Sequence, residues 1–283
     1  MFPYMRLIPS IGLLAVLISF NCTHAEKEPF FAFLYSTGAS SPYELSWPRE
    51  LVYLGVSVGS FTAMKLWMPA PDPFDSADVA ALDRSDVFFL DRPAVDYYYR
   101  GAADVADASN TFALLMPFML LIDKPIRRDM TLLVVMWYEC YFWHRNIRGT
   151  LKILTKRTRP FVYNRELETG RKYTHFARES FPSGHATYVS TYSTLAAKWF
   201  SDYHPESPLK YLVWGGAAAV NLTTGVAKVY SGDHFPTDVA AGLFLGTLVG
   251  WGIPELHKKR NGSVSVLPMI HEERMGMMLS LRF

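Results

Sequence analysis

Residues 211–229 have the sequence YLVWGGAAAVNLTTGVAKV, in which Lys228 is the only charged side chain. A run of this length, without the alternation of apolar and polar side chains that marks a strand, predicts a helix. Residues 239–253, VAAGLFLGTLVGWGI, follow after a short gap and carry no charge. Two long apolar segments in close succession predict two helices that bury apolar faces in a common core.

Four further segments of the same character precede this pair along the chain. They are residues 51–68, 111–122, 131–143 and 186–200. A chain of 283 residues with 50% hydrophobic residues can bury one sizeable core. The predicted fold is therefore all-α, a six-helix bundle over residues 50–256, preceded by a polar, turn-rich lead-in over residues 26–49.

The N-terminus has the pattern of a secretory signal peptide over residues 1–25. Arg6 precedes an apolar run over residues 7–20, and Thr23-His24-Ala25 offers a small residue at the cleavage point. The apolar run is about 14 residues, shorter than the roughly 20 that a membrane span needs. An uncleaved anchor is the alternative.

Two cysteines occur in the chain, Cys22 and Cys140, and the sequence predicts a different environment for each. Cys22 lies where the cysteine of a lipoprotein would lie, although Ser19-Phe20-Asn21 is a poor version of that signal. Cleavage after Ala25 would leave Cys140 alone, so no disulfide could form within the chain. Cys140, inside an apolar run, is expected to be a buried thiol.

The sequence leaves two relations to a membrane open. Residues 111–122 and 131–143 are runs of only 12 and 13 residues that end at Asp123 and His144, short for a crossing. Six spans would place the basic connection 123–129 inside, as the positive-inside rule requires, but would place residues 26–49 inside too. A cleaved signal peptide would place them outside, which favours a bundle exported whole that lies against a membrane.

Two stretches outside the apolar segments have their own patterns. Residues 264–266 and 277–283 alternate apolar and polar side chains around residues 271–274, which predicts a β-hairpin in the C-terminal tail, residues 257–283. The aromatic run Tyr97-Tyr98-Tyr99 could be an interfacial belt or the edge of a substrate site, but packing against the bundle is the favoured interpretation.

Three short segments hold most of the informative polar residues: Lys152 to Pro160 (KILTKRTRP), Pro182 to His185 (PSGH) and Lys228 to Asp238. If the first is helical, Lys152, Lys156 and Arg159 share one face and repel one another unless an anion lies among them. In the second, Ser183 is a good N-cap and Gly184 admits close approach to the free N–H groups of a helix that begins near His185.

The third segment combines a histidine with a carboxylate. Pro236 suits the first turn of a helix, which would place His234 and Asp238 four residues apart on one face. A carboxylate beside a histidine holds one ring nitrogen protonated and aims the other, as a catalytic base or nucleophile requires. Taken alone, each segment is also compatible with an ordinary helix cap or charged surface.

Taken together, the order and spacing of these residues resemble the three-part signature of the type 2 phosphatidic acid phosphatase and vanadium haloperoxidase superfamily. The resemblance implies a six-helix core with the three segments gathered at one end. It implies that His234 is the nucleophile, Asp238 its orienting carboxylate and His185 the acid that protonates the leaving group. Matching positions imply that phosphate is bound by Lys152, Arg159, Ser183, Gly184 and Lys228.

One position departs from the family pattern. Where the family has Ser-Arg, this chain has Ala227-Lys228. Lysine keeps the positive charge but not the two-pronged geometry of a guanidinium, so phosphate would lose one fixed contact. The nucleophile and the acid are unaffected.

The resemblance implies a metal-independent phosphatase that hydrolyses a lipid phosphate or diphosphate monoester through a phosphohistidine, with no cofactor. The expected location is the bacterial cell envelope, with the active site on the periplasmic side and a membrane surface as partner. A net charge of +2 and the lack of a basic strip give no support to nucleic acid as a partner. The alternatives are a vanadium-dependent haloperoxidase that uses the same residues, and an envelope protein that binds lipid phosphates without turnover.

Overall fold

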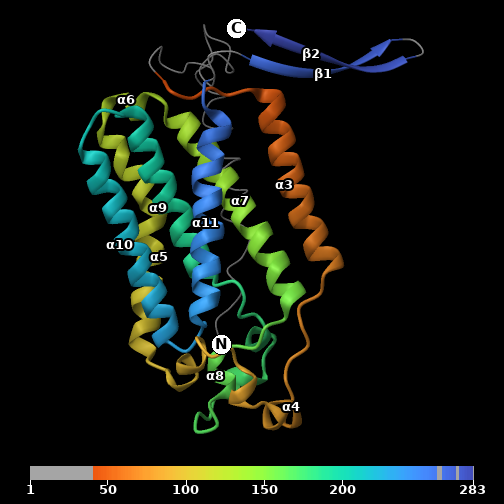
Figure 1. Ribbon diagram of the computed structural model, residues 1–283, viewed down its shortest axis with the longest axis vertical. Helices are drawn as coiled ribbons and strands as arrows, with labels where there is room; N and C mark the ends of the chain where they lie inside the picture. Colours follow the sequence, from red (N-terminus) through yellow and green to blue (C-terminus); the bar gives the residue numbers. More distant parts are fainter. Residues whose placement is uncertain (1–40, 260–262, 272–273, 283) are drawn as a thin grey trace, which may run out of the picture.

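The computed structural model describes residues 41–259, 263–271 and 274–282 of the chain. The six long helices of the predicted bundle are present, and the all-α fold class is confirmed (Figure 1). They are α3 (Trp47–Trp67), α5 (Arg100–Met119), α7 (Met130–Thr155), α9 (Gly184–Tyr203), α10 (Leu209–Tyr230) and α11 (Pro236–His257). The predicted signal peptide and the question of lipidation at Cys22 lie outside the described residues.

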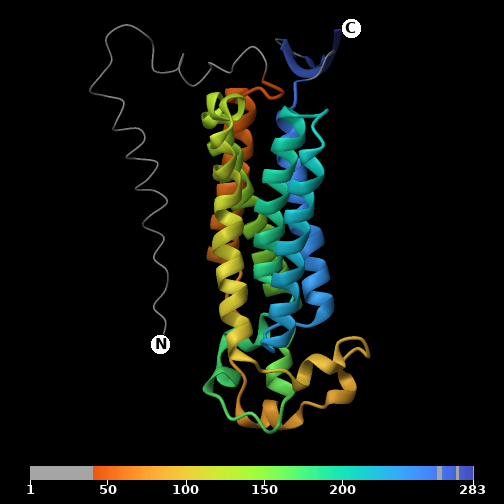
Figure 2. The ribbon, with the colours of Figure 1, turned by 90° about the vertical axis from the view of Figure 1, so that its left-hand side faces the viewer.

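Successive helices run in opposite directions, so the connections collect at the two ends of the bundle (Figures 1 and 2). Residues 68–99, 156–183 and 231–235 lie at the end that is lower in Figure 1, here called the lower end. The opposite, upper end carries residues 41–46, 120–129 and 204–208. Three connections at one end place side chains from distant parts of the sequence close together.

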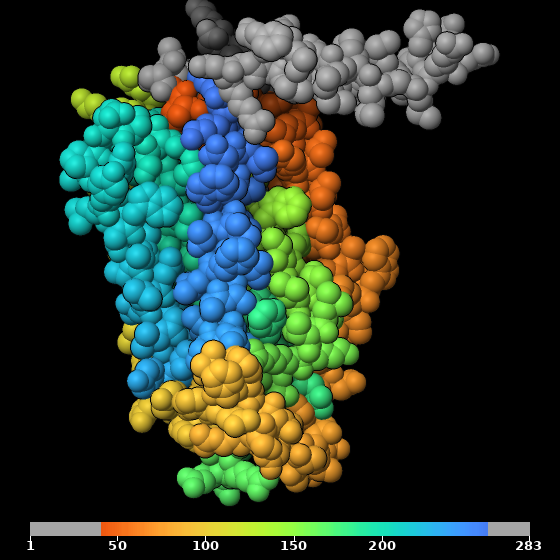
Figure 3. Space-filling view, in the orientation of Figure 1, coloured from red at the N-terminus to blue at the C-terminus, as the bar shows by residue number. Residues whose placement is uncertain are grey.

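Short helices fill these connections. At the lower end they are α4 (Ser76–Ala81), η1 (Arg84–Asp86), η2 (Arg92–Asp96), α8 (Pro160–Tyr163), η4 (Gly170–Tyr173) and η5 (His175–Arg178). At the upper end they are η3 (Leu120–Ile122) and α6 (Lys124–Arg128). On the face drawn in Figure 3, the connection of residues 68–99 covers the lower end of α11.

Helix α9 is the buried centre of the bundle, and α11 packs on it at very close range. A Cβ atom at Gly242, Gly246 or Gly250 of α11 would lie 2.6, 2.1 or 2.2 Å from a backbone carbonyl oxygen of Ser183 or α9. Only glycine permits this approach, which fixes the position of α11 along α9. The N–H of Ser183 also donates to the Asp238 carbonyl oxygen at 2.9 Å, so the starts of the two helices are held together.

Two helices are much longer than their apolar runs predicted. α5 begins at Arg100 instead of residue 111, and α7 ends at Thr155 instead of residue 143. The shorter prediction for α7 was wrong because charged residues were taken as boundaries, whereas His144 and Lys152 are buried within the helix. Charges on an inward face do not end a helix when they line a polar interior.

Three local predictions can be compared with the structure. Tyr97 stacks on Tyr230 of α10 with ring centroids 4.7 Å apart, so the aromatic run packs against the bundle as favoured. Cys140 is a buried free thiol, as expected. In the C-terminal tail, β1 (Ser263–His271) pairs antiparallel with β2 (Arg274–Arg282).

Candidate active site

A cavity of about 240 Å³ opens at the lower end, between α3, α7 and the starts of α9 and α11. Six of the eight residues singled out from the sequence line it: Lys152, Arg159, Gly184, His185, Lys228 and His234. The other two, Ser183 and Asp238, are buried beside it with 0% of each residue exposed. The three sequence segments thus converge on one space, although 76 residues separate Lys152 from Lys228.

Lys152 and Arg159 meet at a shared acceptor, not on one helix face. Lys152 Nζ and Arg159 Nη2 both donate to the carbonyl oxygen of Glu179, the arginine at 3.0 Å. The prediction of a common helix face with Lys156 was wrong, because α7 ends at Thr155 and Lys156 has the left-handed φ of 45° that closes the helix. The chain then turns and returns Arg159 to the cavity.

His234 is the most deeply placed titratable group of the cavity. Its residue is 2% exposed, and its Nε2 lies 3.2 Å from Arg159 Nη1. Burial, followed by the positive charges of Arg159 and Lys152, lowers the pKa of His234 well below its usual value. The imidazole is therefore neutral near pH 7, with a lone pair available on one ring nitrogen.

Asp238 is close to His234 without a direct hydrogen bond. His234 precedes α11, which starts at Pro236, so the prediction that both residues share a helix face was wrong. The His234 Nδ1 to Asp238 Oδ2 distance is 3.8 Å, and Nδ1 has no hydrogen-bond partner. Asp238 instead accepts hydrogen bonds from Arg157 at 2.5 Å, Ser180 Oγ at 2.6 Å and the N–H of Phe235 at 2.9 Å.

His185 lies in the first turn of α9, across the cavity mouth. Its Nε2 is 2.7 Å from Asp107 Oδ1 of α5. Ser183 caps the helix as predicted, because its side chain accepts from the N–H of Ala186 at 3.5 Å. Gly184 leaves room for a cation, since a Cβ there would lie 2.5 Å from Arg148 Nη1.

Lys228 is held by carboxylates on two sides. Its Nζ lies 3.3 Å from Asp233 Oδ2 and 3.9 Å from Asp107 Oδ1. Asp233 also pairs with Arg171 at 2.7 Å. Burial alone would raise the pKa of Asp233, but Arg159, Lys228 and Arg171 outweigh it and hold that pKa well below its usual range. Asp233 is thus a permanent anion that anchors the cations around the cavity.

Several residues of the site were missed from the sequence. Arg148 lies one turn before Lys152 on α7 and lines the same cavity, a spacing that could have indicated it. Arg157 lies within the quoted segment 152–160 but was given no role, and it contacts Asp238. Asp107 and Glu179 contact site residues from outside the three segments, and no sequence signal connects these two to the site, because their proximity arises from the packing of helices and loops.

The family model described as the PAP2 superfamily matches residues 144–262, a range that contains all eight of the residues singled out from the sequence. Over these residues the chain is similar to the PAP2 superfamily. The matched range is the part of the chain that forms α9 to α11, the end of α7 and the connections between them.

Three curated relatives match parts of the chain. YbjG of Escherichia coli, whose name places it among undecaprenyl-diphosphatases, is 30% identical over 105 residues, 36% of this chain and 46% of the relative. Phosphatidylglycerophosphatase B of Bacillus subtilis is 29% identical over 126 residues, covering 42% and 62%. Lipid A 1-phosphatase of Rhizobium etli is 40% identical over 77 residues, covering 27% and 28%. The matches thus span less than two thirds of each relative.

A crystal structure of a transmembrane PAP2-type phosphatidylglycerolphosphate phosphatase from Bacillus subtilis is also similar. It is 19% identical, covers 73% of this chain and 94% of the other, and gives a TM-score of 0.45. The similarity to the PAP2 superfamily reported above does not depend on it.

Proposed function

We propose that this chain is a phosphatase that hydrolyses a lipid phosphate or diphosphate monoester through a phosphohistidine on His234, without a metal ion. The observation that carries the proposal is a buried, neutral His234 whose Nε2 lies at the edge of a cavity lined by cations. The names of all three curated relatives, which are a diphosphatase and two lipid phosphatases, agree with this chemistry.

In the proposed first step, Nε2 of His234 attacks phosphorus as the bond to the leaving oxygen breaks. Lys152, Arg159 and the N–H of Gly184 bind the equatorial oxygens and offset the charge that a metal ion would otherwise neutralise. His185 donates a proton to the departing alkoxide or phosphate oxygen, and Asp107 holds its ring in place. The product is an N–P bond on His234 and a free leaving group.

In the second step, water replaces the histidine. His185, now neutral, accepts a proton from the water as its oxygen attacks phosphorus, and the N–P bond breaks to release inorganic phosphate. For Nε2 to attack, Nδ1 of His234 carries the proton and faces Asp238. Substrate binding is expected to shorten the 3.8 Å gap between these groups.

The charge of the cavity supports a diphosphate substrate over a monophosphate. Its lining includes six cationic side chains and two carboxylates: Lys65, Arg145, Arg148, Lys152, Arg159 and Lys228, with Glu179 and Asp233. Three of these cations, Lys65, Arg145 and Arg148, are not used in the steps above. A second phosphate of the leaving group would be bound by these three.

The outer surface of the bundle supports a membrane location. Helices of 20 to 26 residues are about 30 to 39 Å long, enough to cross a hydrocarbon core of about 30 Å. Large apolar side chains cover their outer faces, among them Val56, Phe112, Leu222, Phe244 and Leu248. By length and composition, Arg100–Ile122 and Pro236–His257 could each cross a membrane. We propose a bundle that spans a bacterial envelope membrane, in place of the exported bundle favoured from the sequence.

The cavity has a side facing the bilayer in this arrangement. Phe61, Met64 and Lys65 of α3 and Arg145 to Ile153 of α7 form that side. A lipid whose chain stays in the bilayer could therefore place its head group in the cavity by entering between α3 and α7. The proposed orientation places the lower end at the periplasmic surface, where the phosphate of such a lipid would be presented.

The central test is phosphate release by purified protein from a panel of lipid and water-soluble phosphomonoesters and diphosphates, with chelator present. Wild type should release phosphate, and His234→Asn should lose about 10³-fold or more of kcat. Wild type quenched in alkali during turnover should carry a phosphoryl group that is stable in alkali and labile in acid, and His234→Asn should carry none. Undiminished turnover in His234→Asn would overturn the proposed nucleophile.

A further inference from the structure

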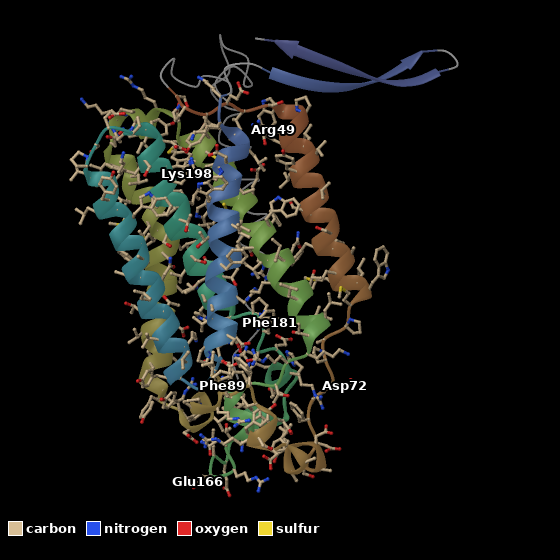
Figure 4. All side chains as sticks on the ribbon, viewed as in Figure 1. Arg49, Asp72, Phe89, Glu166, Phe181 and Lys198 are labelled. Carbon is tan, nitrogen blue, oxygen red and sulfur yellow. The ribbon has the colours of Figure 1, made fainter. Side chains whose placement is uncertain are left out.

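A second polar cluster lies at the upper end of the bundle, remote from the cavity. It consists of Glu50 near the start of α3, Glu139 in α7 and His257 at the end of α11, and is here called the upper cluster. The three residues are 5%, 2% and 0% exposed. One oxygen or nitrogen atom from each lies within 4.8 Å of the other two. In Figure 4, the labelled Arg49 marks this end, and Phe181 marks the opposite, lower end.

The hydrogen bonds of His257 orient a lone pair into the upper cluster. Its Nδ1 lies 2.8 Å from the carbonyl oxygen of Ile253, and a carbonyl only accepts, so Nδ1 carries the proton. In the neutral ring Nε2 is then an acceptor. It lies 3.0 Å from Glu50 Oε2 and 3.4 Å from Glu139 Oε2, both acceptors as well.

Glu139 is deeply buried, and its ion-pair partner is His257. Both of its carboxylate oxygens are buried and without a hydrogen-bond partner. Glu50 Oε1 is stabilised by Arg49 at 2.8 Å and by the N–H of Ser46 at 2.9 Å, which leaves Oε2 facing the cluster. Lys198, the nearest buried lysine of this end, is engaged by Asp202 and Glu255. Two buried carboxylates beside one imidazole are costly unless a proton or a cation offsets their charge.

The distances fit a small divalent cation. Ligand atoms about 2.0 to 2.1 Å from a tetrahedral Zn²⁺ lie about 3.3 Å from one another. The separations of 3.0 and 3.4 Å around His257 Nε2 agree with that value. The carbonyl that fixes the His257 ring through Nδ1 is the usual outer partner of a metal-binding histidine.

We propose that Glu50, Glu139 and His257 bind one zinc ion that joins α3 to α7 and α11 at the upper end. α3 contributes Phe61 and Met64 to the side of the cavity. A cation at the upper cluster would therefore stabilise the helix that borders the cavity, without contact with the reacting atoms. The proposal does not depend on the phosphatase mechanism.

The test begins with the metal content of the full chain purified without chelator, measured by inductively coupled plasma mass spectrometry. About one zinc per chain is expected. After removal of metal, titration with Zn²⁺ should restore one equivalent and raise the melting temperature. Glu139→Gln preserves the size of the side chain but removes its charge, and it should weaken zinc binding at least tenfold.

Glu255→Gln is the matched control, because Glu255 is a carboxylate at the same end of α11 that pairs with lysines outside the cluster. This variant should retain the zinc content of wild type. Purified wild type that contains no zinc and takes none up on titration would overturn the proposal. In that case the cluster would hold a proton in place of a metal ion.

Discussion

At the scale of single residues, His234 shows how a cavity sets the protonation state of a proposed nucleophile. Burial and the cations Arg159 and Lys152 disfavour the imidazolium form and lower the pKa of His234. The unfolded chain binds a proton at this histidine below about pH 6.5, whereas the folded chain does not. The shift therefore reduces the free energy of unfolding as pH falls below that value, and the loss is absent above it.

The lowered pKa of His234 also predicts the pH at which kcat/KM falls on acidification. Because His234 stays neutral, the acidic limb of kcat/KM should lie below pH 6.5. Lys152→Gln removes one of the cations that lower this pKa and should move the limb to higher pH. Ionisation of the substrate is identical for both proteins, so the difference between their pH profiles isolates the enzyme group. Profiles that coincide would contradict this account of the pKa.

Lys228 is the residue that departs from the family pattern, and exchange for arginine tests its role. Lys228→Arg supplies a guanidinium that can bind two phosphate oxygens, so KM should fall several-fold with little change in kcat. Lys228→Gln removes the charge and should reduce kcat/KM by about 10- to 100-fold. Steady-state kinetics measure both effects. If the glutamine variant matched wild type, Lys228 would have no role in binding phosphate.

At the scale of helices, the glycines of α11 decide how the site is assembled. A Cβ at Gly246 would lie 2.1 Å from the Thr187 carbonyl oxygen, so Gly246→Ala forces α11 away from α9. We expect a loss of stability of about 1 to 3 kcal/mol and a loss of activity, since His234 immediately precedes α11. Thermal melts and phosphate release measure these.

Gly252→Ala is the matched control in the same helix, since nothing lies within 4 Å of a Cβ there. It should leave activity unchanged and stabilise the protein by about 0.5 to 1 kcal/mol, because glycine weakens a helix interior. If Gly246→Ala and Gly252→Ala changed stability and activity equally, close packing of Gly246 against α9 would not explain its effect.

At the scale of the whole molecule, the two ends of the bundle face opposite sides of the proposed membrane. Glu166 lies at the lower end in Figure 4, and Lys124 begins α6 at the upper end. In a Cys22→Ser background, a membrane-impermeant maleimide should label Glu166→Cys in intact cells but should label Lys124→Cys only after lysis. Cys140 is buried and should contribute little background.

Labelling of Lys124→Cys in intact cells, and of Glu166→Cys only after lysis, would place the lower end in the cytoplasm. A six-span bundle that follows a cleaved signal peptide has this orientation, because residues 41–46 at the upper end would then be outside. Labelling of both positions in intact cells would instead favour a bundle exported whole. The experiment therefore separates the three arrangements compatible with the apolar segments, and each has a distinct outcome.

The apolar runs of the chain by themselves determined the six helices and their all-α packing, because an apolar run of such length must be buried or lie in lipid. The spacing of Lys152, Arg159, His185 and His234 also sufficed to select residues that line one cavity. These features depend on local pattern and on the order of segments, both of which are present in the linear chain.

Only the tertiary structure decided where helices end, which groups pair and what lies at the upper end. α7 continues past Trp143 because its charged residues face a polar interior, which no local pattern reveals. Asp238 is bound by Arg157 and Ser180 instead of His234, and Glu50, Glu139 and His257 meet from three separate helices. Such contacts depend on how whole helices pack, and sequence separation carries no information about them.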